Sequence, residues 1–151
     1  MKGIIIDCYQ GNHLLNINQI FDCINYYEYQ WMLSSYECNI YNDIPFDKEY
    51  LLISSNQLAE ILSKNDQFIW AVFSGFNSII RKEDIMNYTL PSSDSDSLWQ
   101  KEISIQHPLA EIEIISWDSQ YYIVISKNNN VIEKIRRNIP NCQDLEEYNQ
   151  S

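Results

Sequence analysis

Four cysteines and two histidines are the residues of this chain best suited to covalent chemistry. They are Cys8, Cys23, Cys38 and Cys142, with His13 and His107. Cys8 lies in an apolar run and His13 follows it at the expected start of a helix, so these two side chains can meet in space. A thiol among apolar groups has a raised pKa and reacts slowly, and a catalytic triad is recognised by its geometry. A small enzyme with a Cys/His-containing pocket is therefore an alternative hypothesis, and no catalytic residue is assigned.

Nucleotide and metal sites lack their usual signatures in this sequence. Glycine occurs only at Gly3, Gly11 and Gly75, so there is no glycine-rich loop of the kind that holds phosphate. No two cysteines or histidines have the close spacing of zinc ligands. Asp94 and Asp96 suit a carboxylate cation site, but solvated loop charges are the favoured interpretation. We therefore expect no metal and no cofactor.

Glu111 and Glu113 form a carboxylate pair whose spacing resembles that of an active site. They alternate with Ile112 and Ile114, which places both carboxylates on one face of a strand, roughly 7 Å apart. Glycosidases use carboxylates at such separations, but their general acid also needs an apolar pocket that raises its pKa. An exposed strand face provides no such pocket. We interpret the pair as part of a solvent-facing strand surface.

The charge balance restricts the class of partner. The chain holds 10 basic and 21 acidic residues, for a formal net charge of −11. Such a charge repels the phosphates of nucleic acids and anionic lipid head groups, so we expect neither nucleic acid nor a membrane as partner. The first apolar run ends at Asp7, unlike a signal peptide or a spanning helix. We predict a cytoplasmic protein whose cysteines are free thiols.

An aromatic and acidic stretch, residues 25–41, reads NYYEYQWMLSSYECNIY. Within it Tyr27, Tyr29, Trp31 and Leu33 alternate with polar residues, so a strand is expected to turn these side chains to the core and its polar face to water. The remaining tyrosines offer rigid contact area next to acidic side chains, or alternatively cap the core with their hydroxyls in water. The predicted binding surface consists of Tyr26, Glu28, Tyr36, Glu37, Tyr41, Asp43, Asp47 and Glu49.

Hydrophobic periodicity predicts the elements that position these residues. Strands are expected at 3–9, 27–33, 50–53, 67–76, 111–117 and 121–126, the last two joined by a tight turn at Asp118 and Ser119. Helices are expected from 12 to 24, after the capping residue Ser54, at 81–88 and at 131–139. This order predicts one α+β domain over residues 1–151, with a single mixed, mostly antiparallel β-sheet and about four helices, mainly on one face.

Two polar segments are predicted to be poorly ordered. Residues 91–97 read PSSDSDS and contain no large apolar side chain, so burial cannot offset the entropy cost of ordering them. We expect a mobile loop there. Residues 146–151 belong to an acidic C-terminal stretch and are expected to form a frayed tail.

The order of motifs resembles an uncharacterised family, a domain of unknown function from spore-forming Gram-positive bacteria. The similar pieces are MKGIII, GNHLL, FDCINYYEYQW, LAEILSKNDQFIWAVF, EIISWDSQYYIVIS and KNNNVIEKIRRN. Together they span most of the chain, whereas PSSDSDSLWQKE and the short acidic C-terminus differ from the family pattern. The resemblance implies a bacterial protein, and it transfers no catalytic residue to this sequence. In size and acidity the chain is also similar to toxin-neutralising immunity proteins.

These observations favour a non-enzymatic protein-binding module. The expected partner is a basic protein, which the acidic and tyrosine-rich surface would attract and then bury. An immunity-type inhibitor is one form that such a module can take. The alternatives are the small Cys/His enzyme and a homodimeric structural or regulatory protein, so the chain is expected to be a monomer or a homodimer.

Overall fold

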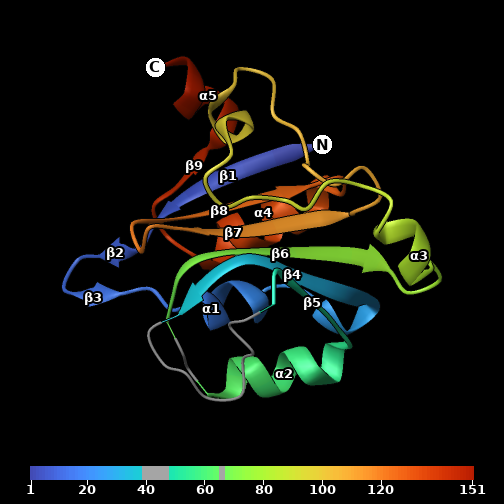
Figure 1. The fold of residues 1–151 in the computed structure, drawn as a ribbon. Coiled ribbons are helices and arrows are strands. Elements are labelled where there is room, and N and C mark those ends of the chain that lie inside the picture. Colours follow the sequence, from blue (N-terminus) through green and yellow to red (C-terminus); the bar gives the residue numbers. More distant parts are fainter. Residues whose placement is uncertain (39–47, 65–66) are drawn as a thin grey trace.

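A seven-stranded β-sheet forms the centre of the protein in a computed structural model that describes residues 1–38, 48–64 and 67–151 (Figure 1). In spatial order the strands are β5 (Tyr50–Ile53), β4 (Tyr29–Cys38), β6 (Phe68–Asn77), β7 (Ile112–Trp117), β8 (Tyr121–Ser126), β1 (Lys2–Asp7) and β9 (Cys142–Asp144). Every described pair of neighbouring strands is antiparallel. The predicted α+β class with a mostly antiparallel sheet is confirmed.

The hairpin of β7 and β8 follows the sequence pattern closely. Trp117 pairs with Tyr121, and the loop between them places Asp118 and Ser119 at φ values of 51° and 56°. Aspartate and serine tolerate this left-handed conformation better than the β-branched residues of the flanking strands do. The turn predicted at these two residues is therefore confirmed. The backbone N–H of Ser119 also donates to the carbonyl of Ile69 at 3.0 Å, which ties the turn to β6.

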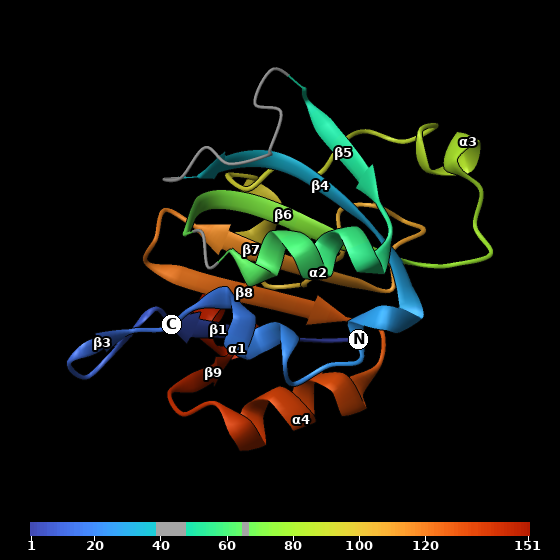
Figure 2. The same ribbon diagram turned by 90° about the horizontal axis from the view of Figure 1, so that it is seen from below.

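Three helices cover one face of the sheet (Figure 2). They are α1 (Ile17–Phe21), α2 (Ser55–Ser63) and α4 (Asn129–Asn138). Their apolar side chains pack on the inward side chains of β4, β6, β7 and β8 in one hydrophobic core. The ring of Phe21 meets Trp31 and Phe73 edge to face at centroid distances of 5.4 and 5.3 Å. The predicted cap of α2 is present, because the Ser54 side chain accepts from the backbone N–H of Gln57.

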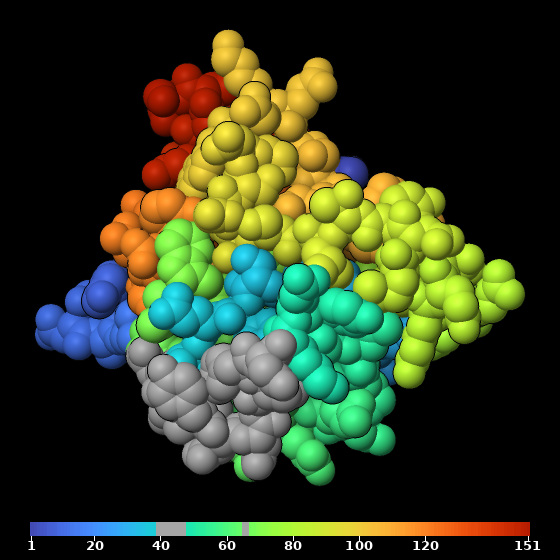
Figure 3. All heavy atoms as spheres, in the orientation of Figure 1, coloured from blue at the N-terminus to red at the C-terminus, as the bar shows by residue number. Residues whose placement is uncertain are grey.

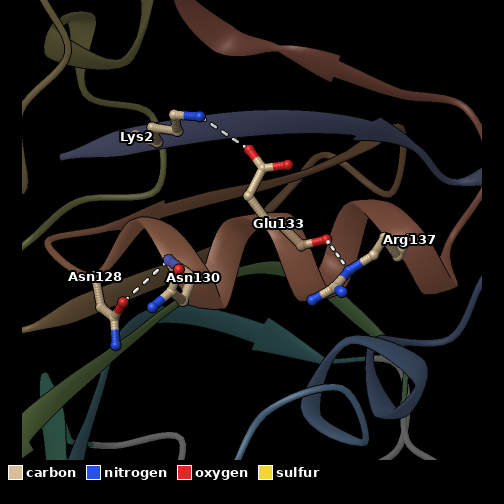
Figure 4. Close-up of polar contacts among 5 residues, drawn as sticks. All are labelled: Lys2, Asn128, Asn130, Glu133 and Arg137. Atoms are coloured by element: carbon tan, nitrogen blue, oxygen red, sulfur yellow. Dashed lines mark hydrogen bonds and ion pairs between the residues drawn. The ribbon is translucent and has the colours of Figure 1, made fainter.

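Helix α4 is anchored at its start and along its exposed side (Figure 4). The Asn128 side chain caps the helix by accepting from the N–H of Asn130 at 3.0 Å. Lys2 on β1 donates to Glu133 at 2.9 Å, and this contact lowers the pKa of the Glu133 carboxyl. Arg137 reaches back to the carbonyl of Glu133. Basic residues in the last turn suit the negative end of the helix dipole, as the sequence predicts.

The second face of the sheet carries its own apolar core. The covering elements are α3 (Lys82–Ile85), the 3₁₀-helix η2 (Asp96–Trp99), α5 (Leu145–Gln150) and the connections between residues 78 and 111. They pack over Met32, Val72, Phe76 and Ile115, all of which are buried. The long connection from β6 to β7 folds back across this face, so the part of it expected to be open to water is covered. The prediction that Glu111 and Glu113 form a solvent-facing surface was wrong, since Glu113 is 0% exposed.

The region before β4 differs from its predicted form. A helix was expected from residue 12, but His13 and Leu14 form the short strand β3, which pairs with β2 (Tyr9–Gln10). The helix starts only after Asn16, whose side chain accepts from the N–H of Asn18. Tyr26–Glu28 form the 3₁₀-helix η1, and Tyr27 is 55% exposed, so its predicted place in the core was wrong. From Tyr29 onward the odd positions face the first core as predicted. The predicted exposure of the opposite face was wrong, because Met32 and Ser34 are buried there.

Candidate functional site

A β-bulge in β4 creates the most prominent irregularity of the sheet. The register of β4 against β6 shifts between Ser34 and Glu37, and Ser35 takes a positive φ of 50°. A bulge adds a residue to one strand and redirects the side chains around it. Here it turns the end of β4 so that Ser35, Tyr36 and Glu37 all border the same depression.

The serine-rich segment 91–97 holds this bulge in place. Ser34 donates from its hydroxyl to the carbonyl of Pro91 at 2.9 Å. The backbone N–H of Ser93 donates to the Ser35 hydroxyl at 3.0 Å, and the Ser93 hydroxyl donates to the Ser35 carbonyl at 3.1 Å. Pro91 and Ser93 are buried. Hydrogen bonds therefore provide the stabilisation that the missing apolar side chains would give this segment. The argument for a mobile loop at 91–97 does not take these bonds into account, and mobility of the loop stays a prediction.

The depression beside the bulge has a volume of about 400 Å³. Three exposed acidic residues border it, namely Glu37, Glu49 and Asp94, together with the exposed basic residue Lys48. Tyr36 fixes one wall, because its hydroxyl donates to the carbonyl of Lys48 at 2.9 Å. The excess of negative charge makes this acidic depression a suitable site for basic side chains. Figure 3 shows the segments that form it meeting on one face of the molecule.

The structure brings together only part of the predicted binding surface. Tyr36, Glu37 and Glu49 all border the acidic depression. Tyr26 and Glu28 belong to η1, which precedes the opposite end of β4, about 20 Å away along an extended strand. Tyr26 stacks there on Tyr27 with a centroid distance of 4.5 Å. These two residues are therefore not part of the depression.

Three further predicted binding residues, Tyr41, Asp43 and Asp47, lie outside the described residues. In turn, the sequence did not single out Trp70, Ser93 or Asp94 as neighbours of Glu37. Trp70 lies opposite Glu37 in the pairing of β4 with β6, and Asp94 comes from the covering segment. No sequence spacing links these positions, because strand pairing and the 91–97 hydrogen bonds bring them together.

Cys8 and His13 do not border a common depression among those of the described residues. Cys8 is buried, and burial raises its pKa to about 12. It borders none of the described depressions, whereas His13 is exposed on β3 and borders a separate depression beside Pro140. His107 is buried and uses both ring nitrogens: Nδ1 accepts from the N–H of Leu109, and Nε2 donates to the carbonyl of Ile85. Burial also lowers the pKa of His107, so this imidazole is a neutral structural group.

This arrangement predicts slow thiol chemistry in the folded protein. Cys8, Cys23 and Cys38 are buried, Cys142 is half-buried, and the pKa of Cys142 is raised to about 11. Because the thiolate is the reactive form, Cys8 should react with a disulfide reagent at neutral pH about a thousandfold more slowly than free cysteine. A titration with and without denaturant measures the rates. A thiol that reacts in the native protein as fast as free cysteine would revive the enzyme hypothesis.

Nothing in the described residues indicates a metal centre or a membrane span. No three His, Cys, Asp or Glu side chains gather there as metal ligands would, and no helix among them is long and apolar enough to cross a bilayer. Comparisons with models of protein families, with curated proteins and with solved structures found no match. The function therefore has to be inferred from the surface of the molecule.

Proposed function

We propose that the acidic depression binds a basic segment of a partner protein and that the chain is a non-enzymatic binding module. The observation that supports this best is the convergence of Glu37, Glu49 and Asp94 around one hollow whose walls are held by hydrogen bonds. A preformed site lowers the entropy cost of binding. An immunity-type inhibitor of a basic protein, acting in the cytoplasm, is the form of this function that fits the net charge of −11.

The chemistry of the depression specifies which groups it accepts. Exposed ion pairs each contribute about 0.2–1 kcal/mol, so one carboxylate gives little affinity. Three acidic residues around one cavity offer several pairing partners to a segment with more than one basic side chain, and the Tyr36 and Trp70 rings add flat surfaces on which a guanidinium can stack. The site should therefore prefer arginine-containing segments. The enzyme and homodimer alternatives stay predictions without a supporting site.

Charge neutralisation at the depression tests this function. The variant Glu37→Gln, Glu49→Gln, Asp94→Asn should bind a blocked tetra-arginine peptide ten- to thirtyfold more weakly at about 20 mM salt, from the loss of about 2 kcal/mol of ion pairing. Binding to the unmodified protein should weaken steeply toward about 500 mM salt. Isothermal titration calorimetry or a fluorescence titration gives both dissociation constants.

A charge-matched variant separates local binding from the general field of an acidic protein. Asp22→Asn, Glu60→Gln, Glu83→Gln removes the same three charges from exposed positions on other elements. It should change the affinity by less than about twofold. Equal losses in the two variants would show that the peptide senses only net charge, and the proposed site would then be wrong.

A further inference from the structure

A strip of aromatic side chains adjoins the acidic depression on the same face. It consists of Trp70, Trp117, Trp99, Tyr121 and Tyr148, which we call the aromatic strip. Trp70 and Trp117 lie 5.5 Å apart between ring centroids, Trp117 and Trp99 5.3 Å, and Trp117 and Tyr121 6.0 Å. Tyr148 on α5 contacts both Tyr121 and Trp99 at 6.2 Å. These residues come from β6, β7, η2, β8 and α5, far apart in the sequence.

The members of the strip are only half-buried. Each retains solvent exposure, unlike Trp31, whose ring is buried and whose indole N–H donates to the carbonyl of Tyr26. The indole N–H groups of Trp70, Trp99 and Trp117 make no hydrogen bond to the part of the chain that the structure describes. The indole planes are inclined by 73° between Trp70 and Trp117 and by 83° between Trp99 and Trp117. Neighbouring tryptophans of the strip therefore pack edge to face. Tryptophan faces with free donors are typical of recognition surfaces.

The strip connects the acidic depression with a second depression that a single carboxylate residue, Asp7, borders. Trp70 borders the acidic depression at one end. At the other end Tyr121 and Tyr148 border a second depression of about 490 Å³, together with the exposed carboxylate of Asp7. In Figure 3 the segments that carry these residues follow one another along the left side of the molecule. A ligand that lies along the strip therefore meets carboxylates at both ends and aromatic rings between them.

Building on the basic-segment binding proposed above, we propose that the aromatic strip receives the continuation of that segment as an extended, arginine-bearing peptide. Carboxylates at both ends require positive charge on the ligand, and a guanidinium stacks on indole and phenol faces better than an ammonium does. An extended chain advances about 3.3 Å per residue, so about four residues pass from Trp70 to Tyr121. With about two further residues seated in each depression, the ligand is about eight residues long.

Peptides of two lengths test this inference. An eight-residue peptide of alternating arginine and glycine should bind the unmodified protein at least tenfold more tightly than the blocked tetra-arginine peptide. Its lysine counterpart should bind several-fold more weakly, because stacking on the rings is reduced. Quenching of tryptophan fluorescence on binding reports contact with the strip. This comparison uses the unmodified protein and does not depend on how any variant folds.

A pair of variants locates the second half of the ligand. Asp7→Asn, Tyr148→Leu should weaken binding of the eight-residue arginine peptide about tenfold and leave binding of the tetra-arginine peptide unchanged. The matched variant Asp22→Asn, Tyr27→Leu, which changes exposed residues near η1, should bind both peptides normally. Thermal unfolding of each variant establishes that it is folded.

The outcomes distinguish the strip from the depression. If the two arginine peptides bind equally well and the Asp7 and Tyr148 changes have no effect, the strip inference is wrong while the depression can still hold. If the depression variant binds both peptides normally, the proposed function fails. Binding of a neutral oligosaccharide such as cellohexaose along the strip, without binding of the eight-residue peptide, would assign these rings to sugar recognition and overturn the peptide inference.

Discussion

The variant Glu113→Gln should be more stable than the unmodified protein by about 3 kcal/mol above pH 7 and should lose this advantage below pH 4.5. Glu113 lies on β7 in the second core and is 0% exposed. The backbone N–H of Gln106 donates to Oε2 at 3.0 Å, while Oε1 has no hydrogen-bond partner among the described residues. Burial raises the pKa of the carboxyl from 4.5 to about 7.

The direction of the effect follows from proton linkage. Between pH 4.5 and about pH 7 the folded protein keeps the Glu113 proton, whereas the unfolded chain has lost it. The free energy of unfolding therefore falls as pH rises, by about 1.4 kcal/mol per pH unit in this window. Glutamine carries no titrating proton, so the free energy of unfolding of the variant does not fall with pH for this reason. Its amide can donate to Ser74, whose hydroxyl is buried, unpartnered among the described residues and directly opposite in the β6 and β7 pairing.

Urea unfolding of both proteins between pH 4 and pH 8 measures this difference. The lowered pKa of His107 acts in the opposite direction, because a histidine that stays neutral in the folded state adds stability as pH rises. Subtracting the two curves cancels this contribution, since both proteins contain His107. A difference that does not vary with pH would show that Glu113 titrates normally in the folded protein.

The second large effect is expected from Gly75→Ala, which should destabilise the protein by about 3 kcal/mol. Gly75 pairs with Trp31 on β4 and with Ile112 on β7 in the centre of the sheet. An added Cβ would lie 2.6 Å from Cγ2 of Ile112 and 3.0 Å from the Trp31 ring. Both contacts are closer than van der Waals packing allows. The indole ring fills the space above the glycine, so the sheet has to shift to admit a methyl group.

A double-mutant cycle tests this cause. Ile112→Ala removes the methyl group at 2.6 Å, so Gly75→Ala should cost at least 1 kcal/mol less in that background. Gly11→Ala is a useful comparison, because an added Cβ there meets nothing within 4 Å and only the φ of 64° opposes it. Denaturant midpoints give each free energy of unfolding. Equal costs of Gly75→Ala in the two backgrounds would rule out the close contact as the cause.

The sequence predicts well those elements whose pattern is local. The hairpin around Asp118, the capped helix after Ser54 and the closing helix that ends near Arg137 each satisfy capping, turn and periodicity rules within a few neighbouring residues. Such signals do not depend on distant parts of the chain. The α+β class follows from their order along the chain.

The sequence predicts poorly those features that depend on what covers a strand. The alternation along β7 correctly places Glu113 on the other face of the sheet from Ile112 and Ile114. It cannot show that residues 78–111 cover the face that carries Glu113. The same limit explains why Tyr36 and Glu37 were placed with Tyr26 and Glu28, which are neighbours along the chain and not in space. Asp94 reaches the site through hydrogen bonds of its neighbour Ser93 to Ser35, a contact between distant segments.

Amide chemical-shift mapping during titration with the blocked tetra-arginine peptide tests the central claim most directly. We expect the largest shifts at residues 35–37, 48–49 and 93–94 and at the indole N–H of Trp70, which together surround the acidic depression. These shifts should disappear in the variant Glu37→Gln, Glu49→Gln, Asp94→Asn. Shifts spread evenly over the acidic residues of α2, α5 and η1, with none concentrated at the depression, would contradict the account.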